Sequence, residues 1–220
     1  MFNATHNLPP DHQPTQPQAS SVLDQVLNLA NLIKSKDLYT YQHQLSVAQH
    51  AAAIADVLKL PNDDIFNIWC GALLHDLGKL NVPNTLLNKR TKLTDEEFYT
   101  VKQHANHGRV IAHMLRLPEV ITDIISQHHE RLDGSGYPYA LIGEQISLPV
   151  RIVCVADVYQ AISHRRPYRS ALGDEFALAE LEKGADQLFD AKVIWGLKQA
   201  LAKKAFITQF SIKYIKKLAE

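Results

Sequence analysis

The stretch "GALLHDLGKLNVP", residues 71–83, places His75 and Asp76 side by side within an apolar segment that has the character of a buried helix. Lys79 follows one turn later. Burying a charged group is costly unless the group is paired or coordinates a metal ion. The stretch therefore predicts that His75 and Asp76 have partners elsewhere in the chain.

Composition narrows the function classes. The chain has 220 residues, which suits one domain with at most a small appendage. Lys+Arg and Asp+Glu number 23 each, so the balance of charge argues against a partner such as polymeric nucleic acid. No apolar run approaches the roughly 18 residues of a transmembrane helix, and the N-terminus has no signal-peptide pattern. Cys70 and Cys154 stand among apolar residues and are interpreted as reduced, buried thiols of a cytoplasmic protein.

The chain divides into four segments. Residues 1–20 are rich in proline and polar residues and are expected to be a disordered tail. Residues 21–36 form an amphipathic helix, which either packs on the main body or pairs two copies as a homodimer. Residues 37–205 are the main domain, and residues 206–220 form a C-terminal amphipathic helix. Apolar spacing and capping signals predict helices over residues 41–58, 63–78, 94–115, 119–131, 148–163, 175–183 and 192–202, so the fold class is all-α.

Several of these helices turn a histidine or an aspartate toward the interior, where an apolar residue is expected. His43, for example, shares a helix face with Val47 and Ile54. One such histidine is usually a hydrogen-bonded core residue, but five helices with the same feature are hard to explain by separate local partners. The inward-facing residues are His43, His75, Asp76, His104, His128, His129 and Asp157.

A shared metal centre explains all seven residues. Imidazole and carboxylate are suitable ligands for iron, manganese, cobalt or zinc. Seven ligands are too many for one ion that also holds water, and they suit two ions bridged by a carboxylate, for which Asp76 is the natural choice. Two metal ions a few ångströms apart can activate a hydroxide and hold a phosphate in line for attack.

Other histidines are assigned differently. His50 lies about 10.5 Å along a helix from His43, which is too far for the same centre, so it is interpreted as a core residue. His107 and His113 are predicted at the surface. His164 shares a helix face with Asp157 and with Gln160, and it either approaches a bound substrate or has no role.

Two further motifs point to a phosphate-containing ligand. "HHERLDGSGYP", residues 128–138, presents Tyr137 on a loop stiffened by Pro138, and this ring either stacks on a base or packs in a tight turn. "HRRPYR", residues 164–169, supplies arginines that can bind phosphate, among them Arg166 and Arg169. No P-loop or GxGxxG motif is present, which excludes P-loop nucleotide hydrolysis.

Together these segments resemble the HD-GYP family of bacterial phosphodiesterases that hydrolyse cyclic di-GMP. The motifs "HDLGK", "VKQHANHG", "HHERLDGSGYP", "VADVYQAI" and "RPYR" occur in the family's order. The resemblance implies an HD-superfamily helical bundle that binds two divalent transition-metal ions, iron or manganese first, and forms linear pGpG, GMP or both. It assigns metal binding to the seven residues above, substrate binding to Tyr137, Arg166 and Arg169, and catalytic roles to Asp76 and Lys79.

The chain departs from the family pattern at two positions. Some family members have a glutamate one turn before the first histidine ligand and bind a third metal, whereas Tyr39 stands here, so a two-metal site is expected. The family usually has an aspartate where this chain has Gln160. A carboxylate could pair with Lys79 or transfer protons, and glutamine cannot, so slow turnover is expected.

Two alternatives are open, and Gln160 favours the first of them. One is a catalytically weak relative that binds metal and dinucleotide and signals through a partner. The other is an HD hydrolase acting on other nucleotides. The loop within residues 128–138, called the GYP loop after its last three residues, argues against this alternative. Regulation is expected to come from the N-terminal helix or from a separate protein.

Overall fold

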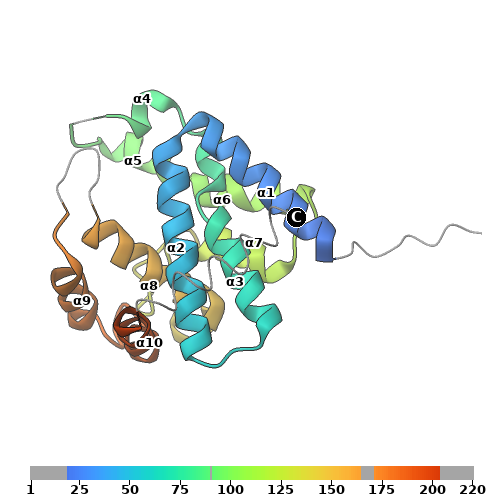
Figure 1. Cartoon of the computed structure of the whole chain (residues 1–220). Coiled ribbons are helices and arrows are strands. Elements are labelled where there is room, and N and C mark those ends of the chain that lie inside the picture. Colours follow the sequence, from blue (N-terminus) through green and yellow to red (C-terminus); the bar gives the residue numbers. More distant parts are fainter. Residues whose placement is uncertain (1–18, 90, 165–170, 204–220) are drawn as a thin grey trace, which may run out of the picture.

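The computed structural model describes residues 19–89, 91–164 and 171–203, and these residues form helices joined by loops, with no β-sheet (Figure 1). The all-α prediction is confirmed. The predicted N-terminal tail up to residue 18, the C-terminal helix over 206–220, and Arg166 and Arg169 lie outside the described residues. The helices are α1 Ala19–Lys36, α2 Leu38–Val57, α3 Asn62–Leu74, η1 Leu77–Asn81, α4 Asn84–Leu87, α5 Asp95–Lys102, α6 His104–Met114, α7 Glu119–Gln127, η2 Gly143–Gln145, α8 Leu148–Ser163, α9 Asp174–Lys183 and α10 Ala191–Ala202.

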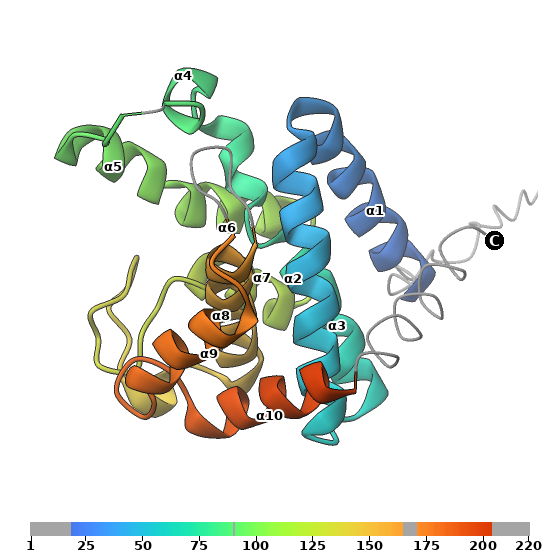
Figure 2. The same ribbon diagram turned by 60° about the vertical axis from the view of Figure 1, so that its left-hand side comes forward.

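Helix α2 is the central element of the bundle. It packs against α1, α3, α8 and α10 (Figures 1 and 2). Asp37 caps its N-terminus by accepting hydrogen bonds from the backbone N–H groups of Tyr39 and Thr40. The middle of the helix is a run of buried alanines, Ala51–Ala53, whose small side chains let neighbouring helices approach from several sides. His43, the metal-binding candidate on α2, is therefore enclosed by other helices.

Helix α1 packs on the main body. Val26, Ala30 and Ile33 are buried against the core, and the helix contacts α2, α3 and η1. The ammonium of Lys36 donates hydrogen bonds to the backbone carbonyl oxygens of Lys79 and Leu80, at 3.1 and 2.7 Å. This is one of the two arrangements that the sequence predicted for residues 21–36. None of the described helices has the length and apolar character needed to cross a membrane.

Three predicted helices end earlier than expected, and each ends next to a histidine. Helix α3 stops at Leu74, α7 stops at Gln127, and the helix predicted over 94–115 is divided into α5 and α6 at Gln103. In each case the following histidine (His75, His104 or His128) places its Nδ1 atom on the backbone carbonyl three residues before it. The ring thus occupies a carbonyl that, in a continued helix, would accept a hydrogen bond from a backbone N–H group. The predictions of unbroken helices were wrong at these three points.

Helix α6 lies directly against η1. A Cβ atom on Gly78 would come within 1.8 Å of the carbonyl oxygen of His104, so no other residue fits at this position without moving the backbone. The contact places Asp76, which precedes η1, beside His104.

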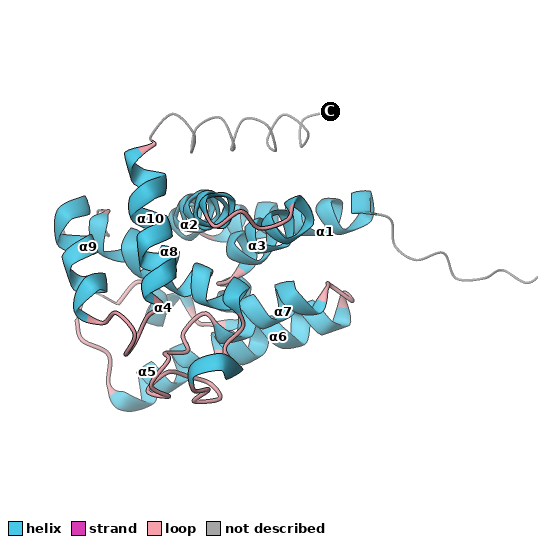
Figure 3. Cartoon of the chain, turned by 90° about the horizontal axis from the view of Figure 1, so that it is seen from below, coloured by secondary structure: helices cyan, strands magenta, loops and turns pink. Residues whose placement is uncertain are grey.

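At the other end of the molecule, α9 and α10 lie away from α5 (Figures 2 and 3).

Candidate metal centre

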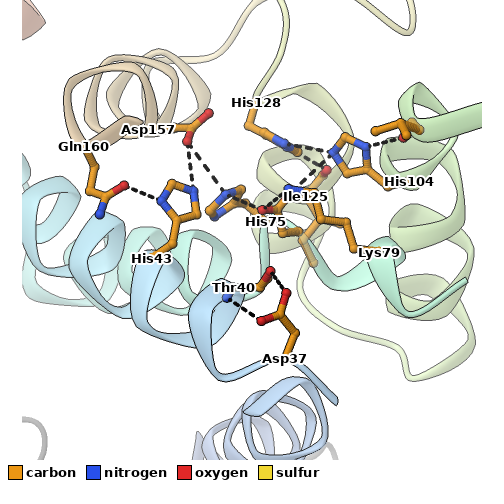
Figure 4. Close-up of polar contacts among 12 residues, drawn as sticks. Asp37, Thr40, His43, His75, Lys79, His104, Ile125, His128, Asp157 and Gln160 are labelled. Atoms are coloured by element: carbon orange, nitrogen blue, oxygen red, sulfur yellow. Dashed lines mark hydrogen bonds and ion pairs between the residues drawn. The ribbon is translucent and has the colours of Figure 1, made fainter. Parts of the chain in front are cut away.

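All seven predicted metal ligands converge at the centre of the bundle, although they come from five separate segments. Figure 4 labels His43, His75, His104, His128 and Asp157 among them. Helix α2 carries His43, the junction of α3 and η1 carries the His75–Asp76 pair, α6 begins with His104, the segment after α7 carries two histidines, and α8 carries Asp157. Three overlapping groups have their ligand atoms within 4.8 Å of one another: His43, His75 and Asp157; His75, Asp76 and His128; and His104, His128 and His129.

Asp76 lies between the two ends of this cluster. Its Oδ2 atom is 3.4 Å from Nε2 of His75, and its Oδ1 atom is 3.4 Å from Nε2 of His104. At one end, Oδ1 of Asp157 is 3.1 Å from Nε2 of His43. At the other end, the Nε2 atoms of His104 and His128 are 3.3 Å apart. The two oxygens of Asp76 thus face different histidines, which is the arrangement required of a carboxylate that bridges two ions.

Hydrogen bonds at Nδ1 orient the ligand histidines. Nδ1 of His75, His104 and His128 lies 2.7, 2.7 and 3.0 Å from the carbonyl oxygens of Ala72, Val101 and Ile125 respectively. Because a carbonyl accepts only from a protonated nitrogen, Nδ1 carries the proton in each ring. Nε2 is then left as a lone-pair donor directed into the cluster, which is how protein histidines are prepared for metal binding.

Gln160 orients the ring of His43 by a hydrogen bond at Nδ1 in the same way. His43 lies within α2, and its Nδ1 donates to Oε1 of the Gln160 side chain in α8 (Figure 4). Lys79, by contrast, places its ammonium 2.6 Å from Oδ2 of Asp76. From the sequence, Gln160 was expected only to lack the two roles of the family's aspartate, pairing with Lys79 and proton transfer. In the structure it has a different contact, a hydrogen bond with Nδ1 of the candidate ligand His43.

The electrostatics of the cluster favour metal binding. Burial lowers the pKa of His104 to about 4 and that of His129 to about 3, and it holds the pKa of His128 well below its usual value. These imidazoles are therefore neutral near pH 7, as metal ligands must be. Burial acts to raise the pKa of Asp76, but nearby positive charge, first that of Lys79, outweighs it and holds this pKa well below the usual range. The carboxylate is thus ionised.

The histidines excluded from the centre lie mostly where expected. His50 is buried, with Nδ1 2.7 Å from the carbonyl oxygen of Ser46 and its ring centroid 5.0 Å from that of Tyr159. His113 is exposed, and His164 bonds to Ser163. The surface prediction was wrong for His107, which is partly buried because α6 packs on both η1 and α7.

Glu130 is a buried residue of the site whose role the sequence did not reveal. Its carboxylate accepts hydrogen bonds from the backbone N–H groups of Tyr139 and Leu141, at 2.7 and 3.0 Å. These bonds hold the GYP loop against the centre, where the Tyr137 ring stacks on His129 with centroids 4.6 Å apart. The sequence did contain a signal for this role, because Glu130 directly follows two inward-facing histidines. A buried carboxylate needs hydrogen-bond donors, so such a position predicts a structural partner for it.

The donor set fits borderline first-row transition metals. The cluster offers imidazole nitrogens and ionised carboxylates, with no thiolate among the candidate ligands. Both cysteines are free and buried, as predicted. The number of ligands exceeds what one ion needs, and the two ends of the cluster are joined by Asp76. The residues therefore fit a binuclear centre held by histidine and aspartate.

Residues 28–193 match the sequence profile of the HD domain. The chain belongs to the HD domain family. A cyclic di-GMP phosphodiesterase of Pseudomonas aeruginosa is 43% identical over 145 residues, which cover 66% of this chain and 35% of the relative. A 3′3′-cGAMP-specific phosphodiesterase of Vibrio cholerae is 36% identical over 196 residues, which cover 89% of this chain and 42% of the relative.

Solved structures agree with this assignment. The crystal structure of a cyclic GMP-AMP-specific phosphodiesterase of Vibrio cholerae superposes with a TM-score of 0.56 and 30% identity, over 84% of this chain and 42% of that one. The chain thus spans less than half the length of each of these relatives. The HD domain, residues 28–193, makes up most of this chain.

The contact between Gln160 and His43 yields a prediction for this HD domain. Gln160→Met removes the acceptor at Nδ1 while keeping the length of the side chain. Loss of a hydrogen-bond partner behind a metal ligand typically costs about 10- to 100-fold in metal affinity. Competitive titration with a chelator should therefore show metal at the ligand group of His43 bound at least tenfold more weakly.

Gln160→Glu serves as the matched variant, because it keeps an oxygen acceptor at the same distance along the side chain and should retain both ions. Equal metal affinity in Gln160→Met and the wild-type chain would show that His43 is oriented without Gln160.

Proposed function

We propose that the chain is a metal-dependent phosphodiesterase that hydrolyses a cyclic dinucleotide, cyclic di-GMP or a related molecule such as 3′3′-cGAMP. The observation that carries this proposal is the buried cluster of seven ligands with Asp76 facing both ends. The names of the relatives support the substrate class. The product is linear pGpG, GMP or both in the case of cyclic di-GMP.

The ligand residues divide between two divalent ions, with iron or manganese as first candidates. His43, His75 and Asp157 serve one ion, His104, His128 and His129 serve the other, and Asp76 serves both. When bound, the two ions supply an activated water nucleophile and positive charge for the phosphate. The bundle around the centre fixes the ligands in place, because all of them except the partly buried His129 are buried.

Lys79 is the residue proposed to act on the reacting groups. Its side chain is 28% exposed whereas that of Asp76 is 2% exposed, so the ammonium lies at the open side of the buried carboxylate. From there it can donate a hydrogen bond to a phosphate oxygen or supply a proton to the leaving oxygen. Tyr137 is proposed to contact a base, and Arg166 and Arg169, outside the described residues, to bind phosphate.

A second candidate function is a weak or inactive enzyme that binds metal and dinucleotide and signals through a separate protein. Gln160 favours it, because an amide engaged with His43 cannot exchange protons. A homodimer through α1 would use the face that does not pack on the body, where Leu32 is 51% exposed.

Turnover assays separate these candidates. The full chain, purified without oxygen, is analysed for metal and then incubated with cyclic di-GMP and 3′3′-cGAMP, with added manganese or iron, and the products are separated by chromatography. Two ions per chain and a linear dinucleotide or mononucleotide product are expected. Tight binding of the dinucleotide without turnover would favour the second candidate, and neither binding nor turnover would overturn the substrate class.

Tyr137→Ala tests the base contact. A base stacked on an aromatic side chain contributes about 1–3 kcal/mol, so binding of cyclic di-GMP should weaken roughly five- to 150-fold, with metal content near that of the wild-type chain. Tyr137→Phe keeps the ring and should bind nearly normally. Unchanged affinity in Tyr137→Ala would mean that the ring only packs on His129.

A further inference from the structure

Lys102 lies beside the candidate metal centre without being part of it. It is the last residue of α5, and its ammonium is 4.8 Å from the ring centroid of Phe98 on the same helix. The same ammonium is 5.4 Å from the centroid of Tyr137, whose ring stacks on His129. The ring of Tyr137 therefore contacts both this positive charge and a candidate metal ligand.

The charge of Lys102 has no acidic partner among the described residues. Lys79 pairs with Asp76, and Lys89 pairs with Glu97 at 2.5 Å, whereas Lys102 contacts only the faces of aromatic rings. The residue is partly buried, so its ammonium is also not fully hydrated. Aromatic rings attract an ammonium more weakly than an anionic oxygen does, so an oxyanion within reach is the preferred partner.

The proposed substrate carries two negative charges, one on each phosphodiester group. A cyclic dinucleotide contains two phosphodiester groups, and only one of them can lie at the metal ligands during hydrolysis. The second phosphodiester then lies outside the cluster of candidate ligands. Lys102 is a cation next to that cluster, and its ammonium has no ion pair or hydrogen bond with the other described residues.

We propose that Lys102 binds the phosphodiester of the cyclic dinucleotide that is not being cleaved. This assignment rests on the proposed function. It makes Lys102 a substrate-binding residue that distinguishes a cyclic dinucleotide from a smaller diester. Contacts with the rings of Phe98 and Tyr137 already restrict the side chain, so less side-chain freedom is lost when the phosphate binds.

The test compares three variants of the full chain. Lys102→Met removes the charge and keeps an unbranched side chain, Lys102→Arg keeps the charge, and Lys92→Met removes the same charge from an exposed position just before α5. Binding is measured with a hydrolysis-resistant phosphorothioate analogue of cyclic di-GMP. Loss of one hydrogen bond to a charged group predicts roughly 10- to 100-fold weaker binding for Lys102→Met, near-normal binding for Lys102→Arg and no change for Lys92→Met.

A second substrate shows whether the effect belongs to the distal phosphate. Bis(p-nitrophenyl) phosphate has a single diester, so the loss in kcat/KM for Lys102→Met should be much smaller with it than with cyclic di-GMP. Equal losses with both substrates would show that Lys102 acts on the metal centre through Tyr137, and unchanged binding of the analogue would show no contact. Either result overturns the assignment. Absence of binding by the wild-type chain would instead overturn the proposed function, and this assignment with it.

Discussion

Asp76→Ala is expected to remove most of both metal ions and nearly all phosphodiesterase activity. Each oxygen of Asp76 faces a histidine from a different end of the cluster, so its removal affects both candidate ion positions. Metal ions contribute several kcal/mol of transition-state stabilisation, and about 1.4 kcal/mol corresponds to tenfold in rate. Turnover should therefore fall by about 10³- to 10⁴-fold, and elemental analysis should approach zero ions from two.

Two controls make this result specific. Asp24→Ala removes an exposed carboxylate from α1 and should keep both ions and full activity. Circular dichroism should show that Asp76→Ala remains helical, because the apolar core of the bundle is unaltered. Metal retained by Asp76→Ala, or a stable stoichiometry of three ions in the wild-type chain, would contradict the two-ion arrangement.

Much of the candidate site could be predicted because charged and imidazole side chains are conspicuous on apolar helix faces. His43 shares its helix face with Val47, and Asp157 stands in an apolar run, so the inward direction of each followed from helical spacing alone. The pairing of different helices did not follow from spacing. It was inferred from the need of several buried polar groups for a common partner, and the structure brings these groups together.

The parts that could not be predicted depend on contacts between distant segments or on exchange between backbone and side-chain hydrogen bonds. The ends of α3, α5 and α7 coincide with histidine rings bound to backbone carbonyls. Helix propensity does not predict these side-chain hydrogen bonds, and therefore does not predict where the helices end. Gln160 and Glu130 have partners that are remote in sequence, at His43 and in the GYP loop. The resemblance to the family indicated only that Gln160 has lost the proton transfer available to an aspartate, whereas its contact with His43 indicates that it orients a candidate ligand.

Lys79→Met is expected to lower turnover by about 10²- to 10⁴-fold while leaving two ions bound near neutral pH, because it removes a donor close to the reacting groups and no metal ligand. The substitution should also change how metal retention depends on pH. Positive charge from Lys79 is the largest influence that lowers the pKa of Asp76 against the opposing effect of burial. Without Lys79 the pKa of Asp76 is higher, so protons compete with metal at higher pH.

As pH falls in the presence of a chelator, Lys79→Met should therefore lose metal before the wild-type chain does. Lys89→Met is the matched control, since the Lys89 side chain is also 28% exposed and is also paired with a carboxylate, yet its partner is Glu97 in α5. It should leave both turnover and the pH of metal release unchanged. A Lys79→Met chain with wild-type turnover would remove Lys79 from the reaction, and an unshifted metal-release curve would show that the lysine does not set the charge state of Asp76. The two measurements are independent, because the first reports on the substrate and the second on the ligand carboxylate before any substrate is bound.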